Sequence, residues 1–280
     1  MTTISGATSS EFSAELTAAR DAALAAGTLR GAEAGRAHQA SVKEDGSPVT
    51  ALDLEADRII QNRLRAAFPR DLIVTEESGA EPPADGSRFW LIDPLDGTRD
   101  FAAGSPEFAV HIALIQEGSP LVAVVHQPAT GALFEAVRGA GAWRIEPTGV
   151  PVRLSVSARA SLAELRIGIS RRSPGERLTR LLAESQLGTG AVPLGASLKL
   201  TAVAAGELDA TLCLHQREKS WDTAAPGLIV TEAGGRITDI DGRPFVYGAG
   251  DQAHHRGIVT SNGRCHEALT ALAARYWPRA

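Results

Sequence analysis

Residues 90–98, which read WLIDPLDGT, join a wholly apolar run to two acids three positions apart. The apolar run predicts a strand, and we expect Pro94 and Gly97 to form a tight turn after it. Two carboxylates on one turn repel each other, and burying them without a cation is costly. Because Mg²⁺ readily takes carboxylate and carbonyl oxygens, the stretch predicts a cation site. The alternative is an Asp-rich turn that caps a short helix from Thr98.

Three more acids fall at the ends of predicted elements. Asp53 opens a helix that begins at about Thr50, Glu76 follows a short apolar strand, and Asp222 heads another helix. Each has a simpler interpretation: a T-x-x-D capping box at Asp53, a solvated strand end at Glu76 and an N-cap at Asp222. Several acids at element ends nevertheless favour one shared metal-binding cleft.

Composition excludes several classes of protein. The 280 residues carry 33 acidic and 28 basic side chains, which argues against a nucleic-acid-binding protein with a broad basic face. Cys213 and Cys265 are too few for a disulfide framework and indicate a reducing compartment. No apolar run approaches about 18 residues, so we expect no membrane span. The first residues do not resemble a signal peptide, and we therefore expect a cytoplasmic protein.

The pattern of elements changes along the chain. A helix is predicted over residues 11–35, and residues 105–156 read as short strands separated by Gly and Pro turns, typical of an antiparallel meander. After residue 157 strands and helices alternate, and one helix is predicted to begin at a capping box, Ser173–Glu176, with Pro at its first position. We expect an N-terminal α+β domain over residues 1–156 and a C-terminal alternating α/β domain over 157–280.

The acidic motifs resemble those of a known family. WLIDPLDGTRDF at 90–101, WDTAA at 221–225 followed by EAGG at 232–235, and EES at 76–78 are similar to the motifs of the inositol monophosphatase superfamily. The resemblance is colinear from about residue 40 to 245. It implies Mg²⁺-dependent, lithium-sensitive phosphomonoesterases with a layered αβαβα sandwich fold, in which the N-terminal domain carries an antiparallel sheet.

The same resemblance implies roles for individual residues. Thr98, oriented by Asp53, would position the attacking water and take up its proton, and Glu76 would share in catalysis. The backbone N–H groups of Gly97 and Thr98 suit phosphate oxygens. Two or three Mg²⁺ ions would be bound by oxygens of Glu76, Asp93, Leu95 (through its carbonyl), Asp96 and Asp222.

Three shorter stretches are most similar to the 3'(2'),5'-bisphosphate nucleotidases of the CysQ type: KEDGSPVT at 43–50, ISRR at 169–172 and GASLK at 195–199. This likeness implies a small phosphorylated substrate, a nucleotide bisphosphate such as 3'-phosphoadenosine 5'-phosphate, cleaved to AMP and phosphate. It leaves a homodimer open. The further substrate-binding residues would be Lys43, Ser170, Arg171, Ser197 and Lys199.

Three alternatives stay open at this point. A haloacid-dehalogenase-type phosphatase has an Asp-x-Asp loop, whereas the acids here are three apart with Pro94 between them. A non-catalytic metal or phosphate sensor would not need both Asp53 and Thr98. An inositol monophosphatase proper or a fructose-bisphosphatase-like sugar phosphatase would have the same metal ligands and a different leaving group.

Overall fold

The computed structural model describes residues 10–31, 40–43, 48–172, 174–185, 187 and 190–277. Two sheets organise these residues. The larger has seven strands, in the spatial order β3 (Leu72–Thr75), β4 (Phe89–Asp96), β5 (Ala109–Gln116), β6 (Ser119–Gln127), β7 (Ala132–Val137), β8 (Gly141–Ile145) and β9 (Pro151–Arg153). The smaller has five strands, in the order β11 (Gly190–Leu194), β10 (Arg166–Ser170), β12 (Ala210–Cys213), β14 (Ile258–Ser261) and β13 (Arg236–Thr238).

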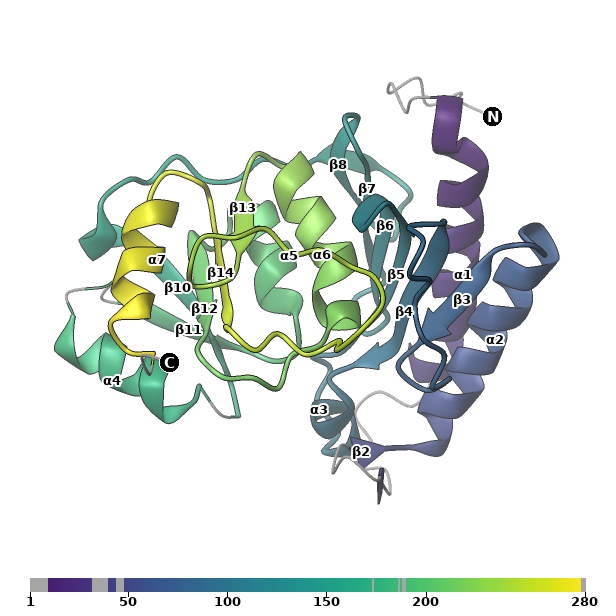
Figure 1. Ribbon diagram of the computed structural model, residues 1–280, viewed down its shortest axis with the longest axis horizontal. Helices are drawn as coiled ribbons and strands as arrows, with labels where there is room; N and C mark the ends of the chain where they lie inside the picture. Colours follow the sequence, from purple (N-terminus) through teal and green to yellow (C-terminus); the bar gives the residue numbers. More distant parts are fainter. Residues whose placement is uncertain are drawn as a thin grey trace.

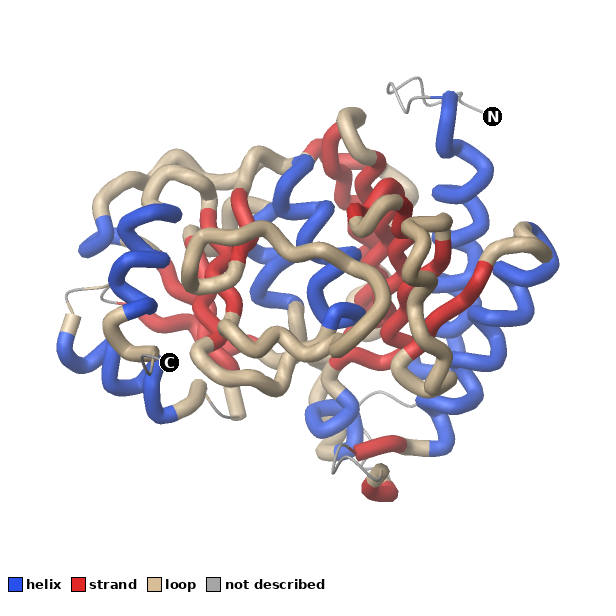
Figure 2. Tube along the Cα trace, in the orientation of Figure 1, coloured by secondary structure: helices blue, strands red, loops and turns tan. Residues whose placement is uncertain are grey.

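Helices form three layers around the two sheets (Figure 1). The longer ones are α1 (Ser13–Gly31), α2 (Ala51–Ala67), α4 (Glu176–Glu184), α5 (Leu198–Ala204), α6 (Ser220–Glu232) and α7 (His266–Ala274). Helices α1 and α2 cover one face of the larger sheet, α5 and α6 lie between the sheets, and α4 and α7 cover the smaller sheet (Figure 2). The expected layered αβαβα sandwich is therefore confirmed.

The larger sheet is the predicted meander with one parallel strand added. From β4 to β9, each strand pairs antiparallel with the next one in the chain, while β3 pairs parallel with β4. Every residue of β4 is buried because α2 packs on one face of the sheet and α6 on the other. Strands covered on both faces read as continuous apolar runs, which explains the sequence at residues 89–92.

Helix α6 explains how two distant parts of the chain come together. It is apolar on nearly all sides, as expected of a helix buried between two sheets. Its residues Leu228 and Ile229 share one core with Leu91 and Val125 of the larger sheet. This core joins elements from both halves of the chain. The division into two domains at 156/157 stays our proposal.

The structure corrects three local predictions and adds one strand. Strand β4 continues through Asp96, with a shift of register between Asp93 and Asp96 in place of the tight turn. Helix α4 begins at Glu176 with Gly175 as its N-cap, so the capping box is wrong, and its Ser173 lies outside the described residues. Helix α6 begins two residues before Asp222, which is therefore not an N-cap. Strand β11 was not predicted.

Other predictions fall partly outside the described residues. The first helix ends at Gly31 in the described part, and residues 32–35 of the predicted range are not described. Of the stretch 43–50, residues 44–47 are likewise outside, and Pro48–Val49 forms β2, which pairs with β1 (Ser41–Val42). Within the described ranges, the helices are all too short or too polar to cross a membrane.

Candidate active site

The end of β4 presents two buried acids. The carboxylate of Asp93, 1% exposed, accepts a hydrogen bond of 2.8 Å from the backbone N–H of Leu95. The carboxylate of Asp96, 9% exposed, accepts one of 2.5 Å from the backbone N–H of Ser197, and His111 Nε2 lies 3.5 Å from the same oxygen. The shift of register at the strand end therefore turns both acids into the interior beside α5.

Asp222 reaches the same place from the first turn of α6. The backbone N–H of Lys219 donates to its carboxylate at 2.7 Å, which closes the first turn of the helix. Carboxylate oxygens of Asp93, Asp96 and Asp222 lie within 4.8 Å of one another. The fold thus assembles a cluster of three carboxylates, called here the oxygen cluster, from one strand end and one helix start.

Electrostatics show why this cluster suits a cation. Burial raises the pKa of Asp93 well above its usual value, and the charges of Glu76, Asp96 and Asp222 raise that pKa further. Burial likewise raises the pKa of Asp222, followed by the charges of Glu218, Asp96 and Glu76. A divalent ion removes this repulsion, and buried, all-oxygen ligands fit the preference of Mg²⁺.

Glu76 belongs to the same site. It follows β3, and its backbone N–H donates to the carbonyl of Ile92 at 3.1 Å. Burial raises the pKa of Glu76 to about 6, although the Lys43 ammonium, 3.0 Å from one of its carboxylate oxygens, opposes that rise. Lys43 also pairs with Glu77 at 2.7 Å. Lys43 is therefore held between two acids here, and its part in substrate binding stays a prediction.

Asp53 makes the contacts of both interpretations that the sequence offered. One of its carboxylate oxygens accepts from the backbone N–H of Thr50 at 2.8 Å, as in a capping box. Its other oxygen lies 3.1 Å from the Thr98 hydroxyl, which is also 3.1 Å from the carbonyl oxygen of Leu95. The cap fixes the carboxylate, and the fixed carboxylate orients the hydroxyl.

A cavity of about 500 Å³ contains these groups. Its lining includes the oxygen cluster, Glu76 and Thr98. Several basic side chains also belong to the lining. The residues that line it are Pro48, Glu76, Asp93, Leu95, Asp96, Gly97, Thr98, Arg99, Asp100, Ser170, Arg172, His215, Gln216, Arg217, Glu218, Lys219 and Asp222.

Four of the expected substrate-binding residues do not line this cavity: Lys43, Arg171, Ser197 and Lys199. The guanidinium of Arg171 pairs with Glu107 at 2.6 Å, outside the cavity. The Lys199 side chain is buried, and its ammonium donates to the carbonyl of Ala196. Ser170 does line the cavity, and the roles of all five residues in substrate binding stay predictions.

The loop before α5 supports the site through a backbone contact that sequence reasoning missed. Ala196 has a φ of +51°, a left-handed conformation that is strained for a residue with a side chain. A Cβ on Gly97, itself at φ +93°, would come within 3.0 Å of the Ala196 Cβ and of the Glu107 carbonyl oxygen. The two loops therefore pack closely, and this positions the Ser197 N–H against Asp96. No local pattern at residue 196 predicts such a contact.

Comparison with known proteins identifies the family. The inositol monophosphatase family model matches residues 13–277, almost the whole chain. The chain belongs to this family. It is therefore a metal-dependent phosphomonoesterase, and this membership excludes the haloacid-dehalogenase alternative.

Curated relatives with three different activities are about equally similar to this family member. It is 35% identical over 247 residues to the inositol-1-monophosphatase of Rhizobium meliloti, covering 86% of this chain and 88% of the relative. It is 36% identical over 244 residues to the histidinol-phosphatase of Streptomyces coelicolor, covering 84% and 87%. It is 37% identical over 212 residues to the 3'(2'),5'-bisphosphate nucleotidase CysQ of Escherichia coli, covering 73% and 81%.

Solved structures agree with the fold. The chain superimposes on the IMPase of Thermotoga maritima with a TM-score of 0.80 and 30% identity, covering 94% of this chain and 97% of that one. The likeness extends over all five layers, so fold and family agree, while the similarity of the relatives leaves the substrate undecided.

Proposed function

We propose that this phosphatase is a 3'(2'),5'-bisphosphate nucleotidase that removes the 3'-phosphate of 3'-phosphoadenosine 5'-phosphate. The observation that carries the proposal is the set of basic side chains in the cavity lining. Arg99, Arg172, Arg217 and Lys219 line the cavity that holds the oxygen cluster. A substrate with a second phosphate gains charge-assisted contacts there, whereas the amine of histidinol phosphate would meet like charge.

The second candidate is an inositol or sugar monophosphatase with the same metal ligands. It is favoured by the inositol-1-monophosphatase relative, which matches more of this chain than the nucleotidase relative does. An inositol ring is uncharged, so this substrate would make little use of the basic lining. The two candidates are therefore separable by substituting a single basic residue.

Glu76, Asp93, Asp96, Asp222 and the Leu95 carbonyl would hold Mg²⁺. When bound, Mg²⁺ supplies positive charge to the ester and lowers the pKa of an attacking water. The Thr98 hydroxyl, oriented by the capped carboxylate of Asp53, would accept a hydrogen bond from that water and pass a proton to Asp53 Oδ1. Gly97 and Thr98 line the cavity and offer backbone N–H groups to the phosphate oxygens.

A substrate panel tests this proposal. Phosphate release is measured on 3'-phosphoadenosine 5'-phosphate, inositol 1-phosphate, fructose 1,6-bisphosphate and histidinol phosphate, with Mg²⁺ and with a chelator. We expect the highest kcat/KM on the nucleotide and no turnover in the chelator. A higher kcat/KM on histidinol phosphate or inositol 1-phosphate would overturn the substrate assignment and leave the phosphatase class intact.

Arg172 and its neighbour provide a matched pair of variants. Arg172 lines the cavity and is held by Asp100 at 2.5 Å, while Arg171 points to Glu107 outside it. We expect Arg172→Ala to raise KM for the nucleotide by about 10-fold or more, the scale of one lost contact to a phosphate, with little change for inositol 1-phosphate. Arg171→Ala should raise KM for the nucleotide less, because Arg171 must leave Glu107 before it can contact a phosphate. Equal effects of Arg172→Ala on both substrates would count against the proposal.

A further inference from the structure

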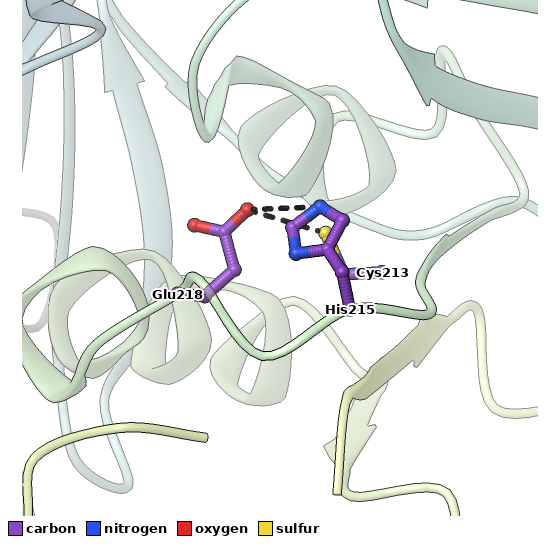
Figure 3. A group of neighbouring side chains, drawn as sticks. All are labelled: Cys213, His215 and Glu218. Carbon is purple, nitrogen blue, oxygen red and sulfur yellow. Dashed lines mark hydrogen bonds and ion pairs between the residues drawn. The ribbon is translucent and has the colours of Figure 1, made fainter. Parts of the chain in front are cut away.

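A second cluster of possible metal ligands lies at the end of β12, which contributes Cys213, and on the loop that follows it towards α6. Cys213, His215 and Glu218 each direct one ligand atom to a common point, and these atoms lie within 4.8 Å of one another (Figure 3). The Glu218 carboxylate is 3.4 Å from the Cys213 sulfur and 3.8 Å from His215 Nε2. None of the three belongs to the acidic motifs that carry the family resemblance.

The two measured separations from the Glu218 carboxylate are close to those between ligands of one tetrahedral ion. With Zn–S near 2.3 Å and Zn–N and Zn–O near 2.0 Å, a tetrahedral site places sulfur about 3.5 Å from oxygen and nitrogen about 3.3 Å from oxygen. The observed 3.4 Å and 3.8 Å differ from these values by half an ångström or less. The third separation, from the Cys213 sulfur to the His215 ring nitrogen, is at most 4.8 Å, so these two side chains would have to approach a shared ion.

The donor atoms select a different metal from the oxygen cluster. Sulfur and imidazole nitrogen favour Zn²⁺ and related ions, whereas Mg²⁺ prefers oxygen alone. We propose that Cys213, His215 and Glu218 bind a thiophilic divalent cation such as Zn²⁺. His215 and Glu218 line the cavity, so an ion that they hold would lie at the cavity wall. This inference does not depend on which phosphate ester the enzyme cleaves.

Charge and proton balance set further requirements. Binding converts the Cys213 thiol to a thiolate, and its proton leaves to the solvent, so about one proton is released for each ion bound. The positive charge of the Lys199 ammonium lowers the pKa of all three side chains. The charges of Arg177 and Arg217 also lower the pKa of His215. These positive charges oppose a second cation. Lys199→Met should therefore tighten the binding of the ion.

The two clusters should antagonise each other. Glu218 precedes α6 and Asp222 lies in its first turn, and both line the same cavity, so a cation on Glu218 removes negative charge beside Asp222 and adds positive charge near it. The affinity of the oxygen cluster for Mg²⁺ should then fall, and linkage requires Mg²⁺ to weaken the second ion by the same factor. The cluster of Cys213, His215 and Glu218 would thus be an inhibitory site for thiophilic ions.

Cobalt titration tests the site without any measurement of activity. Co²⁺ is added to the full chain in saturating Mg²⁺ and a phosphine reductant, and thiolate-to-cobalt charge transfer is followed in the near ultraviolet. We expect the band to saturate at one equivalent, to be reversed by Zn²⁺, and to be lost in Cys213→Ser. The matched control is Cys265→Ser, which removes a buried thiol far from the cavity and should keep the band.

Two further variants cover the case in which Cys213→Ser does not fold. His215→Ala and Glu218→Gln keep the thiol and each remove one other ligand, so we expect Co²⁺ binding at least about 10-fold weaker in both. A wild-type protein without the charge-transfer band, or a band that survives in Cys213→Ser, would overturn the site. Unchanged affinity in both His215→Ala and Glu218→Gln would also overturn it.

Kinetics test the antagonism separately. The Mg²⁺ dependence of phosphate release is measured with and without Zn²⁺, at a Zn²⁺ concentration that saturates the site of Cys213, His215 and Glu218. We expect Zn²⁺ to shift the curve to higher Mg²⁺ in the wild type and to shift it less in Cys213→Ser, where only direct competition in the oxygen cluster remains. Equal shifts in both proteins would refute the antagonism.

Discussion

Asp209 and Asp93 of the oxygen cluster are both buried, but their surroundings are opposite. Asp209, 0% exposed, precedes β12 and accepts hydrogen bonds from the Arg166 guanidinium at 3.1 Å and from the Ser157 hydroxyl at 2.5 Å. Burial alone would raise the pKa of Asp209, but these partners outweigh it and lower the pKa to about 2. In the oxygen cluster, each acid instead has other acids as neighbours, and the pKa values of Asp93 and Asp222 rise.

The difference teaches how to distinguish a structural acid from a functional one. An acid that the chain surrounds with its own donors stabilises the fold as it stands. Acids that the chain buries against one another destabilise the fold until an external cation arrives. The four predictions below test this contrast.

The largest effect is expected from Asp96→Asn. This change removes one negative charge from the oxygen cluster while keeping the size of the side chain. We expect kcat to fall by about 10³-fold or more, because a metal ligand is lost. Circular dichroism and the unfolding midpoint should show an intact fold. A variant that keeps most of the wild-type kcat would remove Asp96 from the active site.

Thr98→Ala should have the next largest effect. The hydroxyl that Asp53 orients is lost, and we expect kcat to fall by about 10²-fold, the scale of a lost general-base partner. Mg²⁺ affinity, measured by calorimetry, should be nearly unchanged because no carboxylate is removed. Abolished Mg²⁺ binding would show instead that Thr98 builds the metal site.

Asp209→Asn should lower stability and leave kcat unchanged. A folded pKa of about 2 against about 3.9 in the unfolded chain corresponds to about 2–3 kcal/mol at pH 7. Because the folded pKa is the lower one, this contribution is complete above about pH 5 and is lost as the pH falls towards 2. Urea denaturation at pH 7 and pH 3 measures it, with the exposed Glu81→Gln as control. A penalty that does not shrink at pH 3 would contradict the electrostatic explanation.

Asp93→Asn should have the smallest effect on the free energy of unfolding, and its sign should be opposite to that of Asp209→Asn. In chelator, removal of one of several repelling charges should raise the free energy of unfolding by about 1 kcal/mol, and the retained amide oxygen can still accept from the Leu95 N–H. Mg²⁺ should raise the Tm of the wild type but scarcely that of the variant. A lower Tm of Asp93→Asn in chelator would place Asp93 with Asp209 among the structural acids.

Much of the fold was predictable because its signals are local. The apolar run at 89–92, the Gly and Pro turns of the meander and the capping box at Thr50 each depend on neighbours in sequence. The acids of the site were also found from sequence, since each stands at the end of an element. The start of α4 and the edge strand Gly190–Leu194 were missed because exposed elements carry weak patterns.

What the sequence determined by itself was the set of acids and the elements that carry them, because hydrophobic periodicity and turn chemistry act over a few residues. Only the tertiary structure decided which charges face one another. It joined Asp222 to Asp93, surrounded Asp209 with Arg166 and Ser157, and paired Arg171 with Glu107 but Arg172 with Asp100. Electrostatic energy depends on distance in space and on burial, and neither is encoded in local sequence.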